Sequence, residues 1–285
     1  MNVLKKSNES PINRIIPIST VDGPGARTAV FLQQCNIGCL YCHNPETQKM
    51  CRHCGACVKK CSTGALMIES GKVVWNKELC IHCDTCIQNC PNNASPKVNT
   101  MTASELMGEI QKNIPFIRGI TVSGGECSLY PQFLTELFQL AQKASLTCLM
   151  DSNGMVDLQK YPELMKVTNG VMLDIKAWDV KVYQRLTKAS SNKIVKKNLK
   201  YLANHDLLKE IRIVYVPDYV DANDAIEGIA SIIKERKKDI PLKLISFRNH
   251  GVRGPLSNSR TPTKSEMLEL KNLAEIQGFE NITIV

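Results

Sequence analysis

The order of hydrophobic and polar positions divides the chain into three parts. Residues 12–33 have an extended character and end in an apolar strand, Thr28–Leu32. Residues 50–99 hold eight cysteines and few long apolar runs. The remainder alternates short apolar strands with helix-like segments. We therefore predict a small insert at 50–99 inside a larger domain built from residues 1–49 and 100–285.

Six strand-like runs lie in the larger domain. Helix-like segments such as Gln132–Lys143, Ala222–Lys237 and Ser265–Gln277 separate the later runs, and Thr102-Ala103-Ser104-Glu105 resembles a capping box before a helix at about 103–113. Strands that alternate with helices form parallel sheets. Six units are too few for a complete eight-unit barrel, so the expected fold is a partial, open α/β barrel. The runs are 28–33, Gly119–Val122, Leu146–Met150, Val171–Leu173, Ile211–Val216 and Leu242–Ile245.

Charge and hydropathy exclude several classes of protein. The chain has 285 residues, 43% of them hydrophobic, and a formal charge of +9. No apolar run reaches the ~18 residues of a membrane helix, and the first residues do not resemble a signal peptide. We therefore expect a cytoplasmic protein without a membrane partner. Basic residues are dispersed and no aromatic-basic stripe accompanies them, so nucleic acid is not an expected partner.

The cysteines are the strongest chemical signal. There are 13, and eleven of them fall between Cys35 and Cys90 in three groups. Clustered cysteines in a reducing compartment are typical of metal sites rather than disulfides. If these eleven thiolates held three cubane clusters, the net charge would fall to roughly +4. Cys127 and Cys148 fit no ligand spacing and are expected to be buried small hydrophobes.

The first group follows the first strand. Cys35, Cys39 and Cys42 have the spacing C-x3-C-x2-C. Three thiolates can bind three irons of a [4Fe–4S] cluster and leave the fourth iron open, which is typical of a catalytic metal site. A helical core stripe is an alternative, but Asn36 and Gly38 are poor helix formers. A zinc site is a second alternative, with His43 as its fourth ligand.

The other two groups have the spacing of a bacterial two-cluster ferredoxin, in which the fourth cysteine of each run ligates the other cluster. Zinc is the alternative, although zinc modules usually pair two C-x-x-C knuckles across a longer gap. Both clusters would have four protein ligands and no open iron, which favours electron relay; a structural role stays possible on this pattern. One cluster is assigned to Cys51, Cys54, Cys57 and Cys90, and the other to Cys61, Cys80, Cys83 and Cys86.

Polar segments follow the later strands. Gly124 and Gly125 let backbone approach a ligand closely, although a tight turn would need the same glycines. Asp151-Ser152-Asn153-Gly154 alone is a turn signal. Asp174 and Lys176 are two residues apart, so both point to one face and can bind a zwitterion. Arg212 lies in an apolar strand, where it either has a charged partner or faces solvent.

The pattern C-x3-C-x-aromatic-C, with Tyr41 as the aromatic residue, resembles the radical S-adenosylmethionine (SAM) superfamily. Residues Val21–Arg27 and Cys42–Glu46 narrow the resemblance to glycyl radical enzyme activating enzymes, close to the YjjW-type branch, over essentially the whole chain. The resemblance implies that SAM binds the open iron and that an electron from the cluster cleaves it to methionine and a 5′-deoxyadenosyl radical. That radical would take a hydrogen from a glycine Cα of a partner glycyl radical enzyme, an anaerobic chemistry.

The resemblance also implies a binding site, a cation and an electron donor. Either Arg248 or His250 would contact the adenosine, with Arg248 at the expected position. A monovalent cation (Na⁺ or K⁺) would bind Asp151, Ser152, Met172 and Asp174. The donor would be reduced flavodoxin or ferredoxin. The implied SAM-binding residues are Tyr41, Cys42, His43, Gly124, Gly125, Glu126, Asp151, Asn153, Asp174, Ile175, Lys176, Arg212, Arg248 and His250.

Two other functions are compatible with parts of the pattern. A radical SAM enzyme that acts on a small molecule, or makes another peptide modification, would share the SAM-cleaving motifs. A non-catalytic electron carrier would explain the ferredoxin-like runs but not Cys35, Cys39 and Cys42. A glycyl radical on a partner chain would distinguish the activating enzyme from the first alternative. Iron content would distinguish it from the second, because three clusters hold about twelve irons per chain and the electron carrier about eight.

Overall fold

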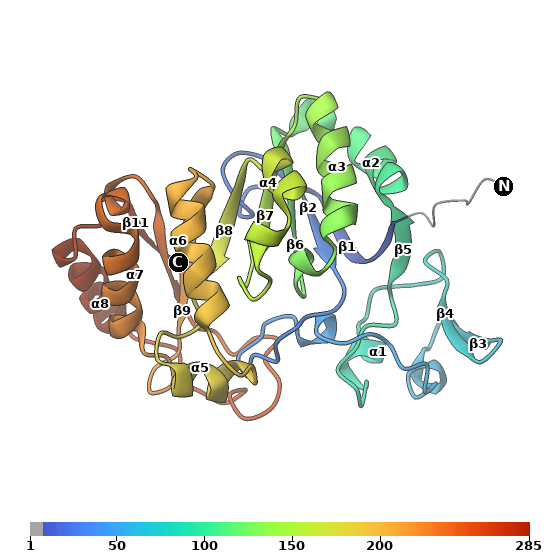
Figure 1. The fold of residues 1–285 in the computed structure, drawn as a ribbon. Helices are drawn as coiled ribbons and strands as arrows, with labels where there is room; N and C mark the ends of the chain where they lie inside the picture. Colours follow the sequence, from blue (N-terminus) through green and yellow to red (C-terminus); the bar gives the residue numbers. More distant parts are fainter. Residues whose placement is uncertain (1–7) are drawn as a thin grey trace.

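The structure is a computed structural model that describes residues 8–285 (Figure 1). Its centre is a nine-stranded sheet with the strand order β11-β10-β9-β8-β7-β6-β2-β1-β5. All seven strands from β11 to β2 run parallel, and β1 is antiparallel to both of its neighbours. The strands are β1 (Glu9–Ser19), β2 (Arg27–Leu32), β5 (Asn99–Thr102), β6 (Gly119–Gly124), β7 (Thr147–Ser152), β8 (Gly170–Asp174), β9 (Leu208–Tyr215), β10 (Leu242–Ser246) and β11 (Ile282–Ile284).

The open parallel sheet confirms the expected partial barrel. All six predicted strands are present. The two edge strands β5 and β11 were not predicted, and β11 is the seventh parallel strand. It is three residues long, too short for a hydrophobic run to stand out. Because β11 and β5 occupy the two ends of the strand order, the barrel does not close.

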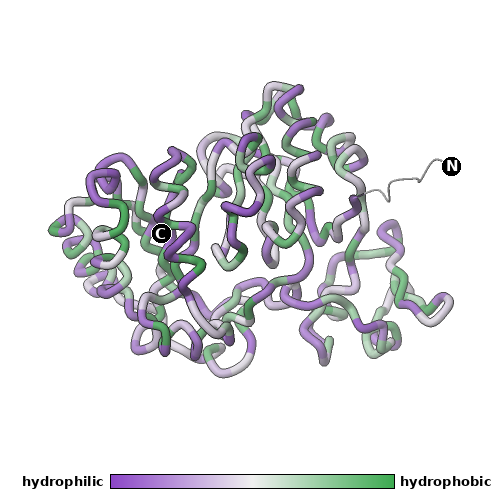
Figure 2. Tube along the Cα trace, in the orientation of Figure 1, coloured by the Kyte–Doolittle hydropathy of each residue, from purple (hydrophilic) through white to green (hydrophobic). Residues whose placement is uncertain are grey.

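Helices cover the outer side of this sheet (Figure 1). Figure 2 shows hydrophobic and hydrophilic turns alternating along them, the pattern of helices that bury one face. The predicted capping box is present at Thr102 and Glu105, whereas the predicted helix 222–237 ends at Ile233 and continues as a 3-10 helix. The helices are α2 (Ala103–Gln111), α3 (Pro131–Lys143), α4 (Pro162–Val167), α5 (Val180–Thr187), α6 (Lys193–Asn204), α7 (Ala222–Ile233) and α8 (Lys264–Ile276), with 3-10 turns η1 (Pro45–Thr47), η3 (Ile114–Phe116), η4 (Cys127–Leu129), η5 (Leu158–Lys160) and η6 (Lys234–Lys238).

The two faces of the sheet differ because successive side chains of a strand alternate. One face carries the apolar residues of the main core, such as Val122, Met150 and Leu173. The opposite, inner face carries polar residues at the intervening positions, such as Asp151 and Arg212. A parallel sheet buried on both faces is apolar on both, so polar residues on the inner face indicate a site.

Residues 12–33 are largely extended, in β1 and β2, and end in the expected strand, but the chain reverses direction between the two strands. Gly23 and Gly25 make this possible with φ values of +116° and +76°, which favour glycine. After the turn, Arg27 is 2% exposed. It donates hydrogen bonds to Thr121 Oγ1 at 2.8 Å and to the oxygen atoms of Ile120 and Thr147 at 2.7 and 2.8 Å. The guanidinium therefore ties together the amino ends of β2, β6 and β7.

The insert lies beside β1 and β5 (Figure 1). It contains the hairpin of β3 (Leu66–Glu69) and β4 (Lys72–Trp75), the short helix α1 (Thr85–Gln88) and the turn η2 (Val58–Lys60). Its own core is small, with Cys57, Leu66 and Val73 as the buried members. So small a core gives little stability by itself, and domains of this size usually need metals or disulfides.

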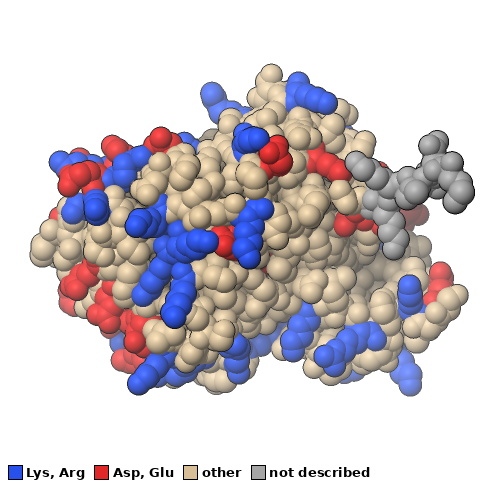
Figure 3. Space-filling model, viewed as in Figure 1, with Lys and Arg blue, Asp and Glu red and all other residues tan. Residues whose placement is uncertain are grey.

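Basic residues gather over α6 in Figure 3. Lys193, Lys197 and Lys200 are exposed there, and Lys197 pairs with Asp157 at 2.7 Å. In η6, Lys238 pairs with Glu280 at 3.6 Å and Arg236 pairs with Asp206 at 2.6 Å. Both groups of basic residues therefore lie on the solvent-exposed surface. Among residues 8–285, no helix is long and apolar enough to cross a membrane.

Candidate active site

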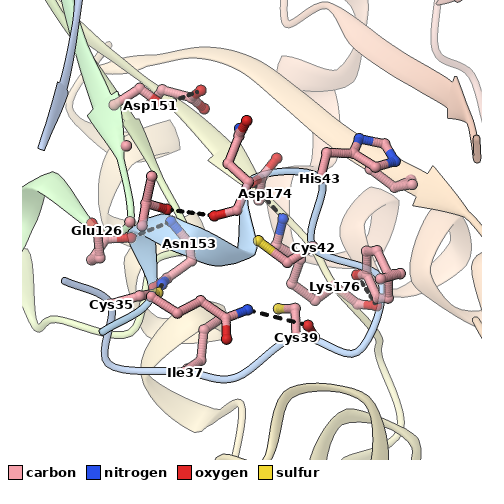
Figure 4. A pocket seen from close by; sticks show the side chains of 18 of the residues that line it. Cys35, Ile37, Cys39, Cys42, His43, Glu126, Asp151, Asn153, Asp174 and Lys176 are labelled. Carbon is pink, nitrogen blue, oxygen red and sulfur yellow. Dashed lines mark hydrogen bonds and ion pairs between the residues drawn. The ribbon is translucent and has the colours of Figure 1, made fainter. Parts of the chain in front are cut away.

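A cavity of about 260 Å³ lies where the carboxyl ends of the parallel strands meet the loop after β2 (Figure 4). Parallel α/β folds place their functional loops at this edge. The predicted residues that line it are Cys35, Cys39, Tyr41, Cys42, His43, Gly124, Gly125, Glu126, Asp151, Asn153, Asp174, Lys176 and Arg212.

The loop with the first three cysteines, residues 35–42, is held on two sides by backbone hydrogen bonds. On one side Cys35 N donates to Gln48 O at 3.0 Å. On the other side Gly38 N and Leu40 N donate to carbonyls of Thr187 and Leu186 at the end of α5, at 2.7 and 2.9 Å. Figure 4 shows Cys35, Cys39 and Cys42 around one end of the pocket.

The three thiols are buried in a place that disfavours an unpaired thiolate. Burial raises the pKa of Cys35 and of Cys39 to about 12, and it also raises the pKa of Cys42. Thiolates in such a setting need positive charge beside them, which bound metal provides.

His43 is not positioned as a fourth ligand. Its Nε2 lies 2.8 Å from the carbonyl oxygen of Arg248, and its ring stacks on Phe247 at 6.0 Å. Within residues 8–285, no three His, Cys, Asp or Glu side chains converge on a point that would suit one metal ion. A four-iron cluster does not require that convergence, because each thiolate binds a different iron. The donor set thus fits the cluster with an open iron better than the zinc alternative.

Gly124 and Gly125 allow the end of β6 to touch the cysteine loop. A Cβ on Gly124 would lie 2.2 Å from the backbone of Leu32, and one on Gly125 would lie 2.2 Å from Gln34 O. Gly124 also has a φ of +116°. The two glycines are therefore needed for the approach of two backbones, and they leave the strand end open to a ligand.

Glu126 is 1% exposed, and its carboxylate accepts four hydrogen bonds. Oε1 accepts from Ser128 N, Ser128 Oγ and Ser152 Oγ at 3.0, 2.5 and 2.8 Å, and Oε2 accepts from Asn153 N at 2.7 Å. Asn153 in turn donates from Nδ2 to Asn36 Oδ1 at 2.9 Å. Glu126 therefore links the end of β7 to the cysteine loop, a positioning role in addition to its place in the cavity wall.

Two ion pairs lie on the inner face of β7, β8 and β9. Asp174 pairs with Lys176 at 2.6 Å, and Asp151 pairs with Arg212 at 3.0 Å. Burial by itself lowers the pKa of Lys176, but Asp174, together with Tyr41 and Cys39 beside it, raises that pKa well above its usual range. The side chain of Arg212 is only 11% exposed and pairs with Asp151. Of the two alternatives for this arginine, the structure therefore has the charged partner and not the solvent-facing position. Oδ1 of Asp151 is buried and has no hydrogen-bond partner.

Five predicted residues lie outside the lining of this cavity. Ile175 and Ser152 are buried, and Met172 lies behind Arg212, whose Nη2 is 3.0 Å from Met172 Sδ. Arg248 and His250 instead line a neighbouring cavity of about 670 Å³, which shares His43 with the first. A loop position two residues from another cannot be assigned from sequence spacing alone, because the path of the loop after β10 is irregular.

The insert brings one predicted set of four cysteines together. Cys51, Cys54, Cys57 and Cys90 line one small cavity. Of the second set, Cys61 and Cys83 are close enough to interact electrostatically. Cys127 and Cys148 are both completely buried, as predicted.

Sequence reasoning missed three residues that shape the site. Ser123 donates to Asp151 Oδ2 at 3.0 Å, and it could have been found because it shares the inner face two positions from Thr121. Asn36 Oδ1 accepts a hydrogen bond from Asn153 Nδ2, and Gln48 donates from Nε2 to Cys39 O at 3.3 Å. Neither has a local signal, because both contacts join segments that meet only in the fold.

The sequence pattern of the radical SAM superfamily matches residues 30–227. The chain belongs to the radical SAM superfamily. This radical SAM protein is 30% identical to the (2S)-3-sulfopropanediol dehydratase activating enzyme of Klebsiella oxytoca, over 86% of its own length and 84% of the relative's. It is 29% identical to the pyruvate formate-lyase-activating enzyme of Clostridium pasteurianum, over 85% and 83% of the two chains.

A third relative spans more of the radical SAM protein. A Haemophilus influenzae protein assigned as a glycyl-radical enzyme activating enzyme is 28% identical, over 96% of both chains. The fold is similar to that of Streptococcus suis SuiB bound to S-adenosylmethionine, with a TM-score of 0.55 and 11% identity, over 89% of this chain and 48% of that one.

We predict that Glu126→Ala lowers the free energy of unfolding by about 3 kcal/mol, because it leaves buried donors of Ser152 and Asn153 without acceptors. Chemical denaturation of the metal-free protein measures this without a contribution from bound iron. Glu136→Ala is the matched control: it removes an exposed carboxylate that accepts from Asn8, and it should change stability by less than about 0.5 kcal/mol. Equal effects of the two variants would contradict the positioning role of Glu126.

Proposed function

We propose that this radical SAM protein activates a partner glycyl radical enzyme by removing a hydrogen atom from one glycine Cα of that partner. The observation that carries the proposal is the loop of Cys35, Cys39 and Cys42, which faces the cavity while His43, the fourth ligand of the zinc alternative, is engaged by the carbonyl of Arg248. When bound, a [4Fe–4S] cluster there supplies the electron that cleaves SAM to methionine and a 5′-deoxyadenosyl radical. The similarity to three activating enzymes over at least 83% of each relative supports the protein partner over a small-molecule substrate.

The strand ends offer groups for both charges of the methionyl part of SAM. Backbone atoms at Gly124 and Gly125 would hold its amino group, and Lys176 would face its carboxylate. Asp174 holds the ammonium of Lys176 at 2.6 Å, so the position of this positive charge is fixed before SAM binds. Tyr41 and His43 line the same cavity and would border the adenosine, as would Arg248 or His250 from the neighbouring cavity.

A monovalent cation, Na⁺ or K⁺, would complete the site. The buried Oδ1 of Asp151 has no hydrogen-bond partner, and such an atom is costly unless something binds it. Oxygen atoms suit hard cations. Asp151 and Asp174, with Ser152 and Met172 next to them, would surround the ion.

The insert would hold two further [4Fe–4S] clusters, one on Cys51, Cys54, Cys57 and Cys90 and one on Cys61, Cys80, Cys83 and Cys86. The first four cysteines line one small cavity, which supports this pairing, and the small hydrophobic core of the insert supports the need for bound metal. Both clusters would relay electrons from reduced flavodoxin or ferredoxin.

We predict a glycyl radical signal by electron paramagnetic resonance when the reconstituted protein, SAM and a strong reductant are mixed anaerobically with a glycyl radical enzyme from the same genome. Cys39→Ala removes one ligand of the proposed cluster, and it should abolish both SAM cleavage and the signal. Cleavage of SAM without any radical on the partner would favour the small-molecule alternative. Absence of cleavage would refute the enzyme assignment itself.

Iron content tests the insert separately. Three clusters predict about twelve irons per chain after reconstitution. Replacing Cys80 and Cys83 together by alanine should lower this to about eight, and the Cys39→Ala variant should also lose about four. About four irons in the parent protein would mean that the insert holds no cluster.

A further inference from the structure

A chain of ion pairs continues from the active-site cavity onto β9 and β10. Arg212 donates from Nη1 to Asp151 Oδ2 at 3.0 Å and from Nε to Glu210 Oε1 at 2.5 Å. The other oxygen of Glu210, Oε2, pairs with Lys243 Nζ at 2.9 Å. Asp151 and Arg212 line the cavity, whereas Glu210 and Lys243 do not. The function proposed above leaves these two outer residues without a role.

The strand register places these side chains next to one another. Met172 pairs with Glu210, Asp174 with Arg212, and Arg212 with Lys243. Glu210 is two residues from Arg212, so both point to the inner face. Their side chains are 16% and 11% exposed, which means that solvent screens the pairs only in part.

The contacts of Arg212 leave one oxygen of Asp151 free. Nη1 of Arg212 and Oγ of Ser123 both donate to Oδ2 of Asp151, at 3.0 Å each. Nη2 of Arg212 donates to Met172 Sδ, and its Nε donates to Glu210 Oε1. Oδ1 of Asp151 therefore keeps no partner. It is the atom that the proposed cation would bind.

This arrangement is not the one that an isolated arginine and carboxylate prefer. A guanidinium usually binds a carboxylate with two parallel hydrogen bonds, one to each oxygen. If Arg212 did so with Asp151, it would occupy Oδ1. Glu210 competes with Asp151 for the guanidinium, because Oε1 of Glu210 binds Nε of Arg212. Asp174 lies opposite Arg212 in the strand register, but its Oδ2 pairs with Lys176 at 2.6 Å, and the ion pairs of Arg212 go to Asp151 and Glu210.

We propose that Glu210 is a positioning residue that holds Arg212 away from Oδ1 of Asp151 and so keeps that oxygen available for the monovalent cation. The inference rests on the cation site of the proposed function. Lys243 pairs with the other oxygen of Glu210, at 2.9 Å, and, being a cation itself, it does not pair with Arg212. Its removal leaves the pair of Glu210 and Arg212 intact.

The test is the dependence of SAM affinity on cation concentration. SAM binding to the reconstituted, unreduced protein is measured by titration calorimetry over a range of KCl and of NaCl concentrations. Tetramethylammonium chloride replaces the salt that is left out, so the ionic strength stays constant. This cation is chosen because it does not coordinate oxygen in the way that K⁺ does. No turnover is needed for this measurement.

For Glu210→Gln we expect the half-saturating cation concentration to rise about tenfold, the size of one charge-assisted hydrogen bond. At saturating cation, the SAM affinity of the variant should return to that of the parent protein. Glu210→Asp keeps the charge and should restore most of the parent behaviour. Lys243→Met is the matched control, because it removes the neighbouring charge and should leave the half-saturating concentration unchanged or lower.

Other outcomes separate this inference from the proposal beneath it. If the parent protein binds SAM equally well at all cation concentrations, the cation site is wrong, and the role of Glu210 is wrong with it. If the parent depends on cation but Glu210→Gln has the same half-saturating concentration, only the role of Glu210 is refuted. A purely structural role would lower SAM affinity equally at every cation concentration. Should Glu210→Gln fail to fold, an unchanged half-saturating concentration in Glu210→Ala would contradict the proposal. A raised half-saturating concentration in Lys243→Met would contradict it as well.

Discussion

The buried carboxylate of Glu126 is the interaction on which the geometry of the site depends. It lies at the point where the end of β6 meets the cysteine loop, and Glu126 N donates to Gln34 O at 2.9 Å. Its two oxygens fix Ser152 and Asn153 at the end of β7. The position of Asn153 then fixes Asn36, one residue after Cys35. A single carboxylate thereby relates two strand ends to the loop that would hold the cluster, and the glycines before it allow the backbones to approach this closely.

The second constraint is electrostatic. The inner face of the sheet gathers Asp151, Asp174, Lys176 and Arg212 in a partly buried space beside three cysteines. Charges in such a space are stable only when each has a partner, and each of these side chains has one. Oδ1 of Asp151 is nevertheless buried without a hydrogen-bond partner. In the proposed function this oxygen would bind the cation, and the ion pairs around it would keep it accessible.

The sequence predicted the strands well because each is short, apolar and bounded by turn residues. It also predicted that polar residues at strand ends would meet, since parallel strands share one edge. β11 was missed because three residues carry too little periodicity. The reversal between β1 and β2 could not be predicted from apolar patterning, because it depends on the positive φ values of Gly23 and Gly25. Contacts such as Gln48 with Cys39, and the position of Arg248 beside His43 rather than in the main cavity, depend on how loops pack, and local sequence does not encode that.

The resemblance and the geometry support the same chemistry but contribute different parts of it. Spacing alone predicts an open metal site at Cys35, Cys39 and Cys42, and the structure turns His43 away from it. Family membership adds SAM. The choice of a glycine in another protein as the hydrogen donor rests on the similarity to activating enzymes, and it is the central claim.

Transfer of deuterium tests that claim most directly. A candidate partner enzyme is prepared with α-deuterated glycine and treated with the reconstituted protein, SAM and a reductant, and the 5′-deoxyadenosine product is analysed by mass spectrometry. The account predicts one deuterium in each 5′-deoxyadenosine formed during activation. Product that contains only protium, in the presence of a glycyl radical on the partner, would contradict direct abstraction from that glycine.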